Sequence, residues 1–319
     1  METNEIKVLS EKIKQNINKV IIGKSQVIDV IITAIIAGGH VLLEDVPGTG
    51  KTVMAKTLAR SIGASFKRVQ FTPDLLPSDL TGINYYNQKM GEFTFRSGPI
   101  FTNILLGDEI NRATPRTQSS LLECMEEKQV TLDGKTHILE KPFFVIATQN
   151  PVETQGTFPL PEAQLDRFLV KLNMGYPSLE EGKQIMQRFM MSNPLEELEL
   201  VCSKEELVDA SKSAVKVHVE EEIQEYMLKI VEATLNHASV ILGVSPRGSL
   251  ALLKTCQVYA AIKGRDFVTP EDVKLLCPYV LSHRIILKDN IKFRGVTSDD
   301  IIEEILNTIA VPTEKWASR

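Results

Sequence analysis

Residues 44–52, "EDVPGTGKT", contain most of what a loop needs in order to hold a chain of phosphates. In such a loop backbone N–H groups surround the phosphates, a lysine reaches the outer ones and the next hydroxyl binds Mg²⁺. Lys51 and Thr52 occupy those two positions. Asp45 stands where the usual pattern has Gly, but its side chain can point away from the phosphates at the turn between strand and loop. An ordinary turn before a helix is the alternative. The predicted nucleotide contacts are Val46, Pro47, Gly48, Thr49, Gly50, Lys51, Thr52 and Val53.

A second group of polar residues follows the apolar stretch "NILLGDE", residues 103–109. Asp108 can hold Mg²⁺ while Glu109 polarises an attacking water, because phosphoryl transfer depends mostly on positioning and charge stabilisation. Asn150, at the end of "VIATQN", could orient that water without adding charge. Either group could instead be a solvated turn at the end of a strand.

The elements that must position these residues follow from the pattern of apolar residues. Near-continuous apolar runs at 40–44, 103–109 and 143–150 predict strands of a parallel sheet covered on both faces. The first run precedes a predicted helix over 52–61, and the second precedes a helix that begins after Pro115. The first half of the chain is therefore predicted to be an α/β domain.

The second half shows helical periodicity. Ser245 and Thr269 are each followed by proline, which is a signal for the start of a helix, and Ser298 precedes two aspartates and an apolar run. The predicted domains are 1–176, which includes a leading amphipathic helix, and 177–319, a helical lid, with a linker over 175–182.

Two segments fit neither pattern. Residues 71–101 are too rich in Gly and Pro for an ordinary loop, and their alternating "EFTFR" predicts an inserted hairpin. Residues 128–141 predict a second hairpin, with Asp133 and Gly134 in its tight turn.

Bulk properties exclude several classes of protein. The 319 residues carry a formal net charge of −5, which argues against a broad nucleic-acid surface. The most apolar stretch, 30–43, is shorter than the roughly 20 residues of a membrane span. No signal peptide is predicted, so the expected location is the cytoplasm. The four cysteines are scattered and indicate reduced thiols rather than a disulfide framework or a zinc site.

Four long motifs together resemble the MoxR family of AAA+ ATPases, and the resemblance covers nearly the whole chain. The motifs are "LLEDVPGTGKT", "ILLGDEINRATPRTQSSLLECMEEKQVTLDG", "VIATQNPVETQGTFPLPEAQLDRF" and "GVSPRGSLALL". The resemblance implies an AAA+ P-loop core with inserted hairpins, followed by a smaller all-helical lid. It also implies that the cofactors are ATP and Mg²⁺.

The resemblance assigns roles to individual residues. Lys51 and Thr52 match Walker A, Asp108 and Glu109 match Walker B, Asn150 matches sensor 1, and Arg247 matches sensor 2. Arg247 lies in the first turn of a predicted helix, where it could meet a phosphate or simply be a surface residue.

Arg167 resembles the arginine finger, which would reach the nucleotide of a neighbouring subunit. An internal pair with Asp166 or Glu162 is the alternative. Arg112 is a weaker candidate for the subunit interface. Ile21, Ile22 and Gly23 match the segment that packs on adenine, although the two isoleucines could be core residues.

Members of this family form rings, usually hexamers, and are thought to act as chaperone-like factors on other proteins. Their partners often carry a von Willebrand factor A domain. We therefore expect a homo-oligomer with a protein client, and hypothesise that residues 83–95 and 130–138 form its moving surface. The alternatives are a nucleic-acid-remodelling motor, against which the net charge argues, and a nucleotide-sensing module without significant turnover.

Overall fold

The computed structural model describes residues 1–46, 48–151, 156–191 and 193–312. At its centre is a parallel sheet with the strand order β2-β5-β8-β1-β9. The three central strands are those predicted from the sequence. The edge strands escaped prediction because one carries charged residues and the other has three residues. The strands are β1 (Val41–Glu44), β2 (Phe66–Gln70), β5 (Ile104–Asp108), β8 (Phe144–Gln149) and β9 (Val170–Leu172).

The two faces of the sheet have separate apolar cores, because successive residues of a strand point to opposite faces. Leu106 and Ile146 belong to one buried cluster, and the neighbouring Leu105 and Val145 belong to the other. The first cluster includes α1 (Thr3–Asn18), α2 (Ser25–Ile36) and α3 (Lys51–Ser61), and the second includes α4 (Pro77–Thr81) and α5 (Pro115–Glu127). This arrangement is the predicted α/β layering.

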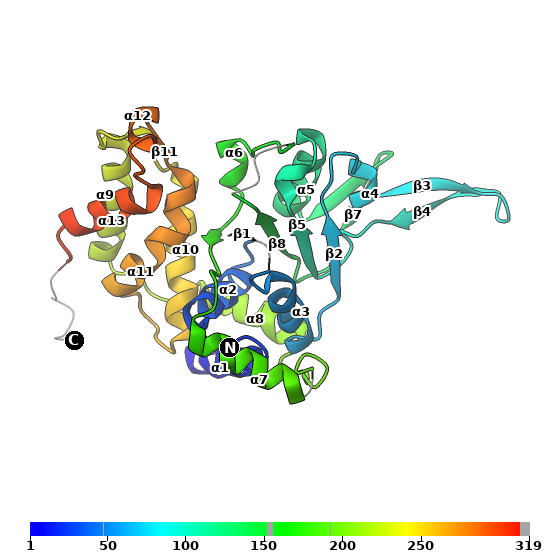
Figure 1. The fold of residues 1–319 in the computed structure, drawn as a ribbon, viewed down its shortest axis with the longest axis horizontal. Coiled ribbons are helices and arrows are strands. Elements are labelled where there is room, and N and C mark those ends of the chain that lie inside the picture. Colours follow the sequence, from blue (N-terminus) through cyan, green and yellow to red (C-terminus); the bar gives the residue numbers. More distant parts are fainter. Residues whose placement is uncertain (47, 152–155, 192, 313–319) are drawn as a thin grey trace.

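Both predicted hairpins are present. Strands β3 (Gly82–Asn87) and β4 (Glu92–Ser97) form a ribbon that extends far from the body of the molecule (Figure 1). Strands β6 (Gln129–Leu132) and β7 (Lys135–Ile138) form the shorter one. Asp133 and Gly134 both have positive φ in its turn, as the tight turn requires.

The lid is helical, as predicted, with a short antiparallel pair of strands that the sequence did not indicate. Ser245 and Thr269 cap their helices as predicted, whereas the last helix is capped by Thr297, one residue before the expected Ser298. The lid elements are α9 (Glu221–Asn236), β10 (Val240–Leu242), α10 (Pro246–Ile262), α11 (Pro270–Leu281), the 3₁₀ turn η2 (Ser282–Arg284), β11 (Ile286–Leu287), α12 (Asp289–Lys292) and α13 (Ser298–Thr308).

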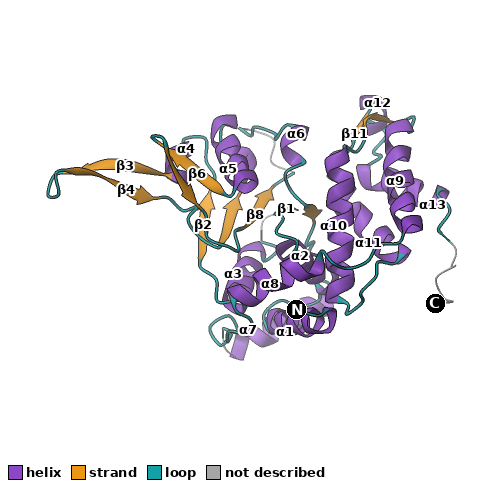
Figure 2. Ribbon diagram, turned by 180° about the vertical axis from the view of Figure 1, so that it is seen from behind, coloured by secondary structure: helices purple, strands orange, loops and turns teal. Residues whose placement is uncertain are grey.

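Two helices after residue 176 lie beside the N-terminal helices, and the second of them also contacts α10 of the lid (Figures 1 and 2). The first begins at Leu179, so the predicted linker over 175–182 is partly helical. The chain passes to them from α6 (Glu162–Leu165) and β9, and they are α7 (Leu179–Met191) and α8 (Lys204–Ala214). Arg188 of α7 donates to the carbonyls of Asn18 and Lys19 at 2.7 and 2.6 Å. A boundary at residue 176 would separate α7 and α8 from helices that they contact, and it stays a prediction.

All four cysteines are free and buried, as the prediction of reduced thiols requires. Within the described part of the chain, none of the helices has both the length and the apolar character needed to cross a membrane.

Candidate functional site

The loop after β1 has the geometry of a phosphate-binding loop. Gly48 and Gly50 have φ of 86° and 89°, and a Cβ at either residue would meet no atom within 4 Å. Helix α3 begins at Lys51, whose Nζ donates to the carbonyls of Asp45 (3.0 Å) and Val46 (3.2 Å). The lysine ammonium therefore lies inside the curve of the loop. Pro47, a predicted contact, lies outside the described residues.

Asp45 has a structural task that explains the departure from the usual glycine. Its side chain is buried and accepts the N–H groups of Val46 (2.9 Å), Met174 (2.9 Å) and Gly175 (3.1 Å). It is not among the described residues with positive φ, so no left-handed backbone is needed at this position. The carboxylate ties the phosphate loop to the chain that leaves β9.

The two acidic residues at the end of β5 are held by different neighbours. Asp108 Oδ1 accepts the Thr148 hydroxyl at 2.7 Å, and its Oδ2 pairs with Arg68 at 2.6 Å. Thr148 and Arg68 were not predicted from the sequence, because no local motif links them to Asp108. They orient the carboxylate from the two strands on either side of β5.

Glu109 follows with φ of 56°, a conformation that is uncommon for residues other than glycine. Its N–H donates to the hydroxyl of Thr148 at 2.8 Å. Its Oε2 accepts from Gln70 Nε2 at 3.0 Å and from Arg112 Nε at 2.9 Å. Arg112 thus lies beside the carboxylate that could polarise water.

Asn150 comes directly after β8 and is buried. Because β8 lies between β1 and β5 in the sheet, the ends of these strands place Asn150 between the phosphate loop and the pair Asp108–Glu109. This position suits a neutral amide that contacts both a phosphate and a water molecule.

The oxygen donors suit Mg²⁺. The Thr52 hydroxyl and the Asp108 carboxylate are hard oxygen ligands, and Mg²⁺ usually completes its shell with water and substrate phosphates. Among the described residues there is no cluster of three His, Cys, Asp or Glu residues that could hold a metal by itself. Thr52 and Asp108 could supply two of the oxygen ligands of an Mg²⁺ ion bound to a nucleotide.

An apolar pocket of about 220 Å³ adjoins the phosphate loop. Its walls include Ile22 and Val53, which were predicted as contacts. They also include Ile185 and Phe189 of α7, which no local motif indicates because they lie far along the chain. Gly23 has φ of 77°, and a Cβ there would collide with the Glu181 side chain. The lining residues are Val20, Ile21, Ile22, Lys24, Gly48, Thr49, Gly50, Val53, Met174, Gly175, Pro177, Ile185 and Phe189.

The two predicted arginines lie elsewhere, on the wall of a different cavity of about 340 Å³. Arg167 Nε is 3.2 Å from Oε2 of Glu126, and the guanidinium of Arg247 contacts Oε1 of the same carboxylate. Arg167 thus makes an internal pair, as the alternative held, but its partner is Glu126, and Asp166 pairs with Arg284. The described lining of this cavity shares no residue with the pocket beside the phosphate loop.

Comparisons with known proteins agree with this architecture. Residues 40–170 match the ATPase family associated with various cellular activities (AAA), and residues 232–305 match the AAA lid domain. A solved structure of an ATPase candidate from Cytophaga hutchinsonii superimposes with a TM-score of 0.91 and 38% identity, covering 98% of this chain and 97% of that one.

Similar sequences name the branch of this large group. Chaperone MoxR1 of Mycobacterium tuberculosis is 39% identical, over 93% of this chain and 80% of its own length. Protein MoxR of Methylorubrum extorquens is 30% identical, over 94% of each chain. The uncharacterized protein YeaC of Bacillus subtilis is 52% identical, over 97% of this chain and 96% of its own length. The chain belongs to the MoxR family of AAA+ ATPases.

Proposed function

We propose that this chain hydrolyses ATP with Mg²⁺ at sites completed by a neighbouring copy in a ring, and that it uses hydrolysis to remodel a protein partner. The observation that carries the proposal is the separation of two half-sites in one chain. The phosphate loop lines one pocket, and the acidic pair ends β5 at the same edge of the sheet, whereas Arg167 and Arg247 line a different cavity. A nucleotide that meets both sets would have to lie between two copies.

On the first half-site, Lys51 and the N–H groups of the phosphate loop would bind the β- and γ-phosphates. Thr52 and Asp108 would hold Mg²⁺, which supplies charge stabilisation between the phosphates. Glu109 would polarise the attacking water, and Asn150 would orient it from the neighbouring strand. The pocket formed by Ile21, Ile22 and α7 would take the adenine, because its apolar walls suit a flat aromatic base.

On the second half-site, Arg167 would act as the arginine finger toward the neighbour's γ-phosphate. Arg247 shares its carboxylate partner with Arg167 and would approach the same nucleotide. It would therefore act across the interface, and not on the phosphates bound by its own chain. Separating cation from phosphate in this way makes hydrolysis depend on assembly, and an arginine finger supplied by a neighbour can contribute 10³ to 10⁵ in rate.

The dependence on assembly can be measured with the purified chain. ATP hydrolysis per subunit should rise with protein concentration over the same range in which light scattering detects the oligomer. Binding of a fluorescent ATP analogue, which needs only the first half-site, should vary much less over this range. Hydrolysis per subunit that stays constant down to concentrations where the chain is monomeric would refute a shared site.

The two hairpins are the proposed surface for the protein partner. The long hairpin exposes Tyr86 and Phe93, whose rings contact each other at 5.4 Å between centroids. Asn84 donates to Asp133 at 2.7 Å, and Phe95 stacks on His137 at 4.2 Å, so the hairpins can move as one unit. Exposed aromatic side chains are the common anchors of protein interfaces. A protein with a von Willebrand factor A domain is the proposed client.

Copurification tests the role of this surface. A tagged chain with Glu109→Gln should hold ATP without turnover and retain its partner, since hydrolysis would otherwise drive release. Removing residues 130–138 from that variant should abolish copurification while ATP binding persists. Retention of the same partner by the shortened chain would reject the hairpins as the contact surface.

A further inference from the structure

Arg284 is a buried arginine of the lid that the proposed chemistry does not use. It lies in η2, directly after α11, and its side chain is 3% exposed. Its Nε donates to Oδ1 of Asp166 at 2.6 Å. Burial lowers the pKa of Arg284, and the Asp166 carboxylate acts in the opposite direction. The pair joins the lid to the residue that precedes Arg167.

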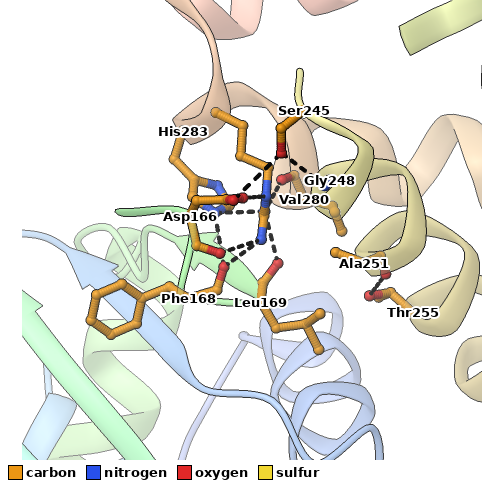
Figure 3. Close-up of polar contacts among 10 residues, drawn as sticks. Asp166, Phe168, Leu169, Ser245, Gly248, Ala251, Thr255, Val280 and His283 are labelled. Carbon is orange, nitrogen blue, oxygen red and sulfur yellow. Dashed lines mark hydrogen bonds and ion pairs between the residues drawn. The ribbon is translucent and has the colours of Figure 1, made fainter. Parts of the chain in front are cut away.

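All five N–H groups of this guanidinium have an acceptor. Figure 3 labels the residues that supply these acceptors, Asp166, Phe168, Leu169 and Val280. Besides the carboxylate of Asp166, the guanidinium binds backbone carbonyls on both sides of the finger residue. Those beside the finger residue are the carbonyls of Asp166 (3.1 Å), Phe168 (2.7 Å) and Leu169 (3.2 Å), and the guanidinium also donates to the carbonyl of Val280 in α11. Only arginine offers five donors in a fixed plane, so no other side chain could satisfy these acceptors together.

The same arginine also lies under the helix that carries Arg247. A Cβ at Gly248 would come within 2.9 Å of Cδ of Arg284, so glycine lets the two elements approach. The hydroxyl of Ser245, which caps this helix, is 3.5 Å from Oδ2 of Asp166. The backbones that carry Arg167 and Arg247 therefore meet at one partly buried ion pair, that of Arg284 and Asp166.

We propose that Arg284 is a positioning residue that fixes Arg167 and Arg247 relative to each other, so that the orientation of the lid governs hydrolysis on the neighbouring copy. The proposal rests on the function proposed above, in which both arginines act across the interface. A displacement of about 1 Å at a positioned catalytic group can lower a rate by about 10²-fold. In the described contacts Arg284 touches neither the nucleotide pocket nor the phosphate loop. Its substitution should therefore impair the half-site formed by Arg167 and Arg247 and leave nucleotide binding by the same chain unchanged.

Mixtures of variants separate this role from a merely structural one. Arg284→Lys keeps the charge that Asp166 needs but offers three donors in place of five. Alone, it should bind ATP and assemble as the wild type does, and it should hydrolyse ATP about 10²-fold more slowly. Mixed 1:1 with Lys51→Ala, it should recover up to about a quarter of wild-type activity, because one interface in four joins an intact nucleotide site to intact arginines. Mixed with Arg167→Ala, it should recover nothing, because neither subunit then offers a positioned finger.

A matched control and a second variant keep the test decisive. Arg265 makes a bidentate pair with Asp272 inside the lid, at 2.7 and 2.6 Å. Arg265→Lys therefore removes similar guanidinium hydrogen bonds without affecting residues 166–169. It should hydrolyse ATP within about threefold of the wild type. If Arg284→Lys does not fold, Asp166→Asn breaks the same ion pair from the core side and should give the same pattern in both mixtures.

The opposite results overturn the inference. Recovery with Arg167→Ala but not with Lys51→Ala would mean that Arg284 supports the nucleotide-binding half-site of its own chain. Recovery with neither partner would mean that its role is purely structural. Wild-type activity of Arg284→Lys alone would show that hydrolysis does not need the guanidinium hydrogen bonds of Arg284. The reference mixture of Lys51→Ala with Arg167→Ala tests the shared site itself. If this reference mixture recovers activity but the mixtures with Arg284→Lys do not give the results stated above, the shared site stands and only the positioning role of Arg284 is rejected.

Discussion

Arg167 and Arg247 bind the two oxygens of a single carboxylate, that of Glu126. One arginine follows the core helix α6 and the other lies in the first turn of the lid helix α10. Glu126 therefore holds the two cations that the proposed mechanism assigns to a neighbouring nucleotide. A phosphate chain that enters between copies would compete with this carboxylate for both.

Glu126→Gln is predicted to keep hydrolysis within about threefold of the wild type, because partly exposed ion pairs contribute about 0–1 kcal/mol. Arg167→Ala, in contrast, should lower the rate by about 10³-fold or more. Steady-state hydrolysis of the two variants, with denaturant unfolding as a control for stability, makes the comparison. A loss in Glu126→Gln as large as that in Arg167→Ala would mean that the carboxylate takes part in the reaction.

Asp45→Gly restores the usual glycine of the phosphate loop, yet it is predicted to harm the protein. The substitution removes a buried acceptor of three backbone N–H bonds, from Val46, Met174 and Gly175. The Gly175 N–H keeps a second acceptor, Oδ1 of Asn173 at 2.6 Å, so the N–H groups of Val46 and Met174 are the two that lose their partner. An unpaired buried donor costs about 1–3 kcal/mol, so we expect a fall of about 2–6 kcal/mol in the free energy of unfolding. Urea unfolding of the wild type and the variant measures it. An unchanged or higher stability would contradict the assigned role of Asp45.

Magnesium removal tests the ligand set. Excess EDTA should abolish hydrolysis and leave ADP binding largely in place, because the loop N–H groups and Lys51 need no metal. Thr52→Ala should require more Mg²⁺ for half-maximal hydrolysis, whereas Thr52→Ser keeps the hydroxyl and serves as the control. A magnesium titration of hydrolysis for the three proteins is the measurement. Superimposable curves for Thr52→Ala and the wild type would show that Thr52 is not a ligand of Mg²⁺.

Protonation of His40 is expected to account for part of the pH dependence of the free energy of unfolding. Its ring is fully buried, where Nδ1 accepts the N–H of Val145 at 3.0 Å, and burial lowers its pKa from 6.5 to about 4. The folded protein favours the neutral ring, whereas the unfolded chain takes up a proton as the pH falls below 6.5. The contribution of neutral His40 to the free energy of unfolding is therefore complete above pH 6.5 and is lost as the pH falls toward 4. The difference corresponds to about 3 kcal/mol.

His40→Gln does not titrate, so its stability should fall less between pH 6.5 and 4 than that of the wild type. Urea unfolding at both pH values gives the two differences directly. Equal losses in the two proteins would show that another group carries the acid sensitivity.

The sequence predicted the central strands and both hairpins because each has a local signal. β5 and β8 are continuous apolar runs, and Asp133–Gly134 is a turn that few other residue pairs would make. The acidic pair and the phosphate loop were placed for the same reason, since each follows directly from the strand before it.

The residues that escaped prediction act through contacts between distant segments. Thr148 and Arg68 reach Asp108 from neighbouring strands, and Ile185 and Phe189 close the apolar pocket from a helix more than a hundred residues beyond the loop. Arg284 meets Asp166 in the same way. No pattern of types and spacing along one segment reports such contacts, because they depend on how the sheet and the lid come together.

The most direct test of the central claim is a 1:1 mixture of Lys51→Ala and Arg167→Ala subunits. Each variant alone should be nearly inactive, the first because it cannot hold the phosphates and the second because it lacks the finger. If the nucleotide lies between two copies, the mixture should recover up to about a quarter of wild-type hydrolysis, since one interface in four joins the two intact halves. Activity no greater than the average of the separate variants, in a mixture shown to form joint oligomers, would contradict the account.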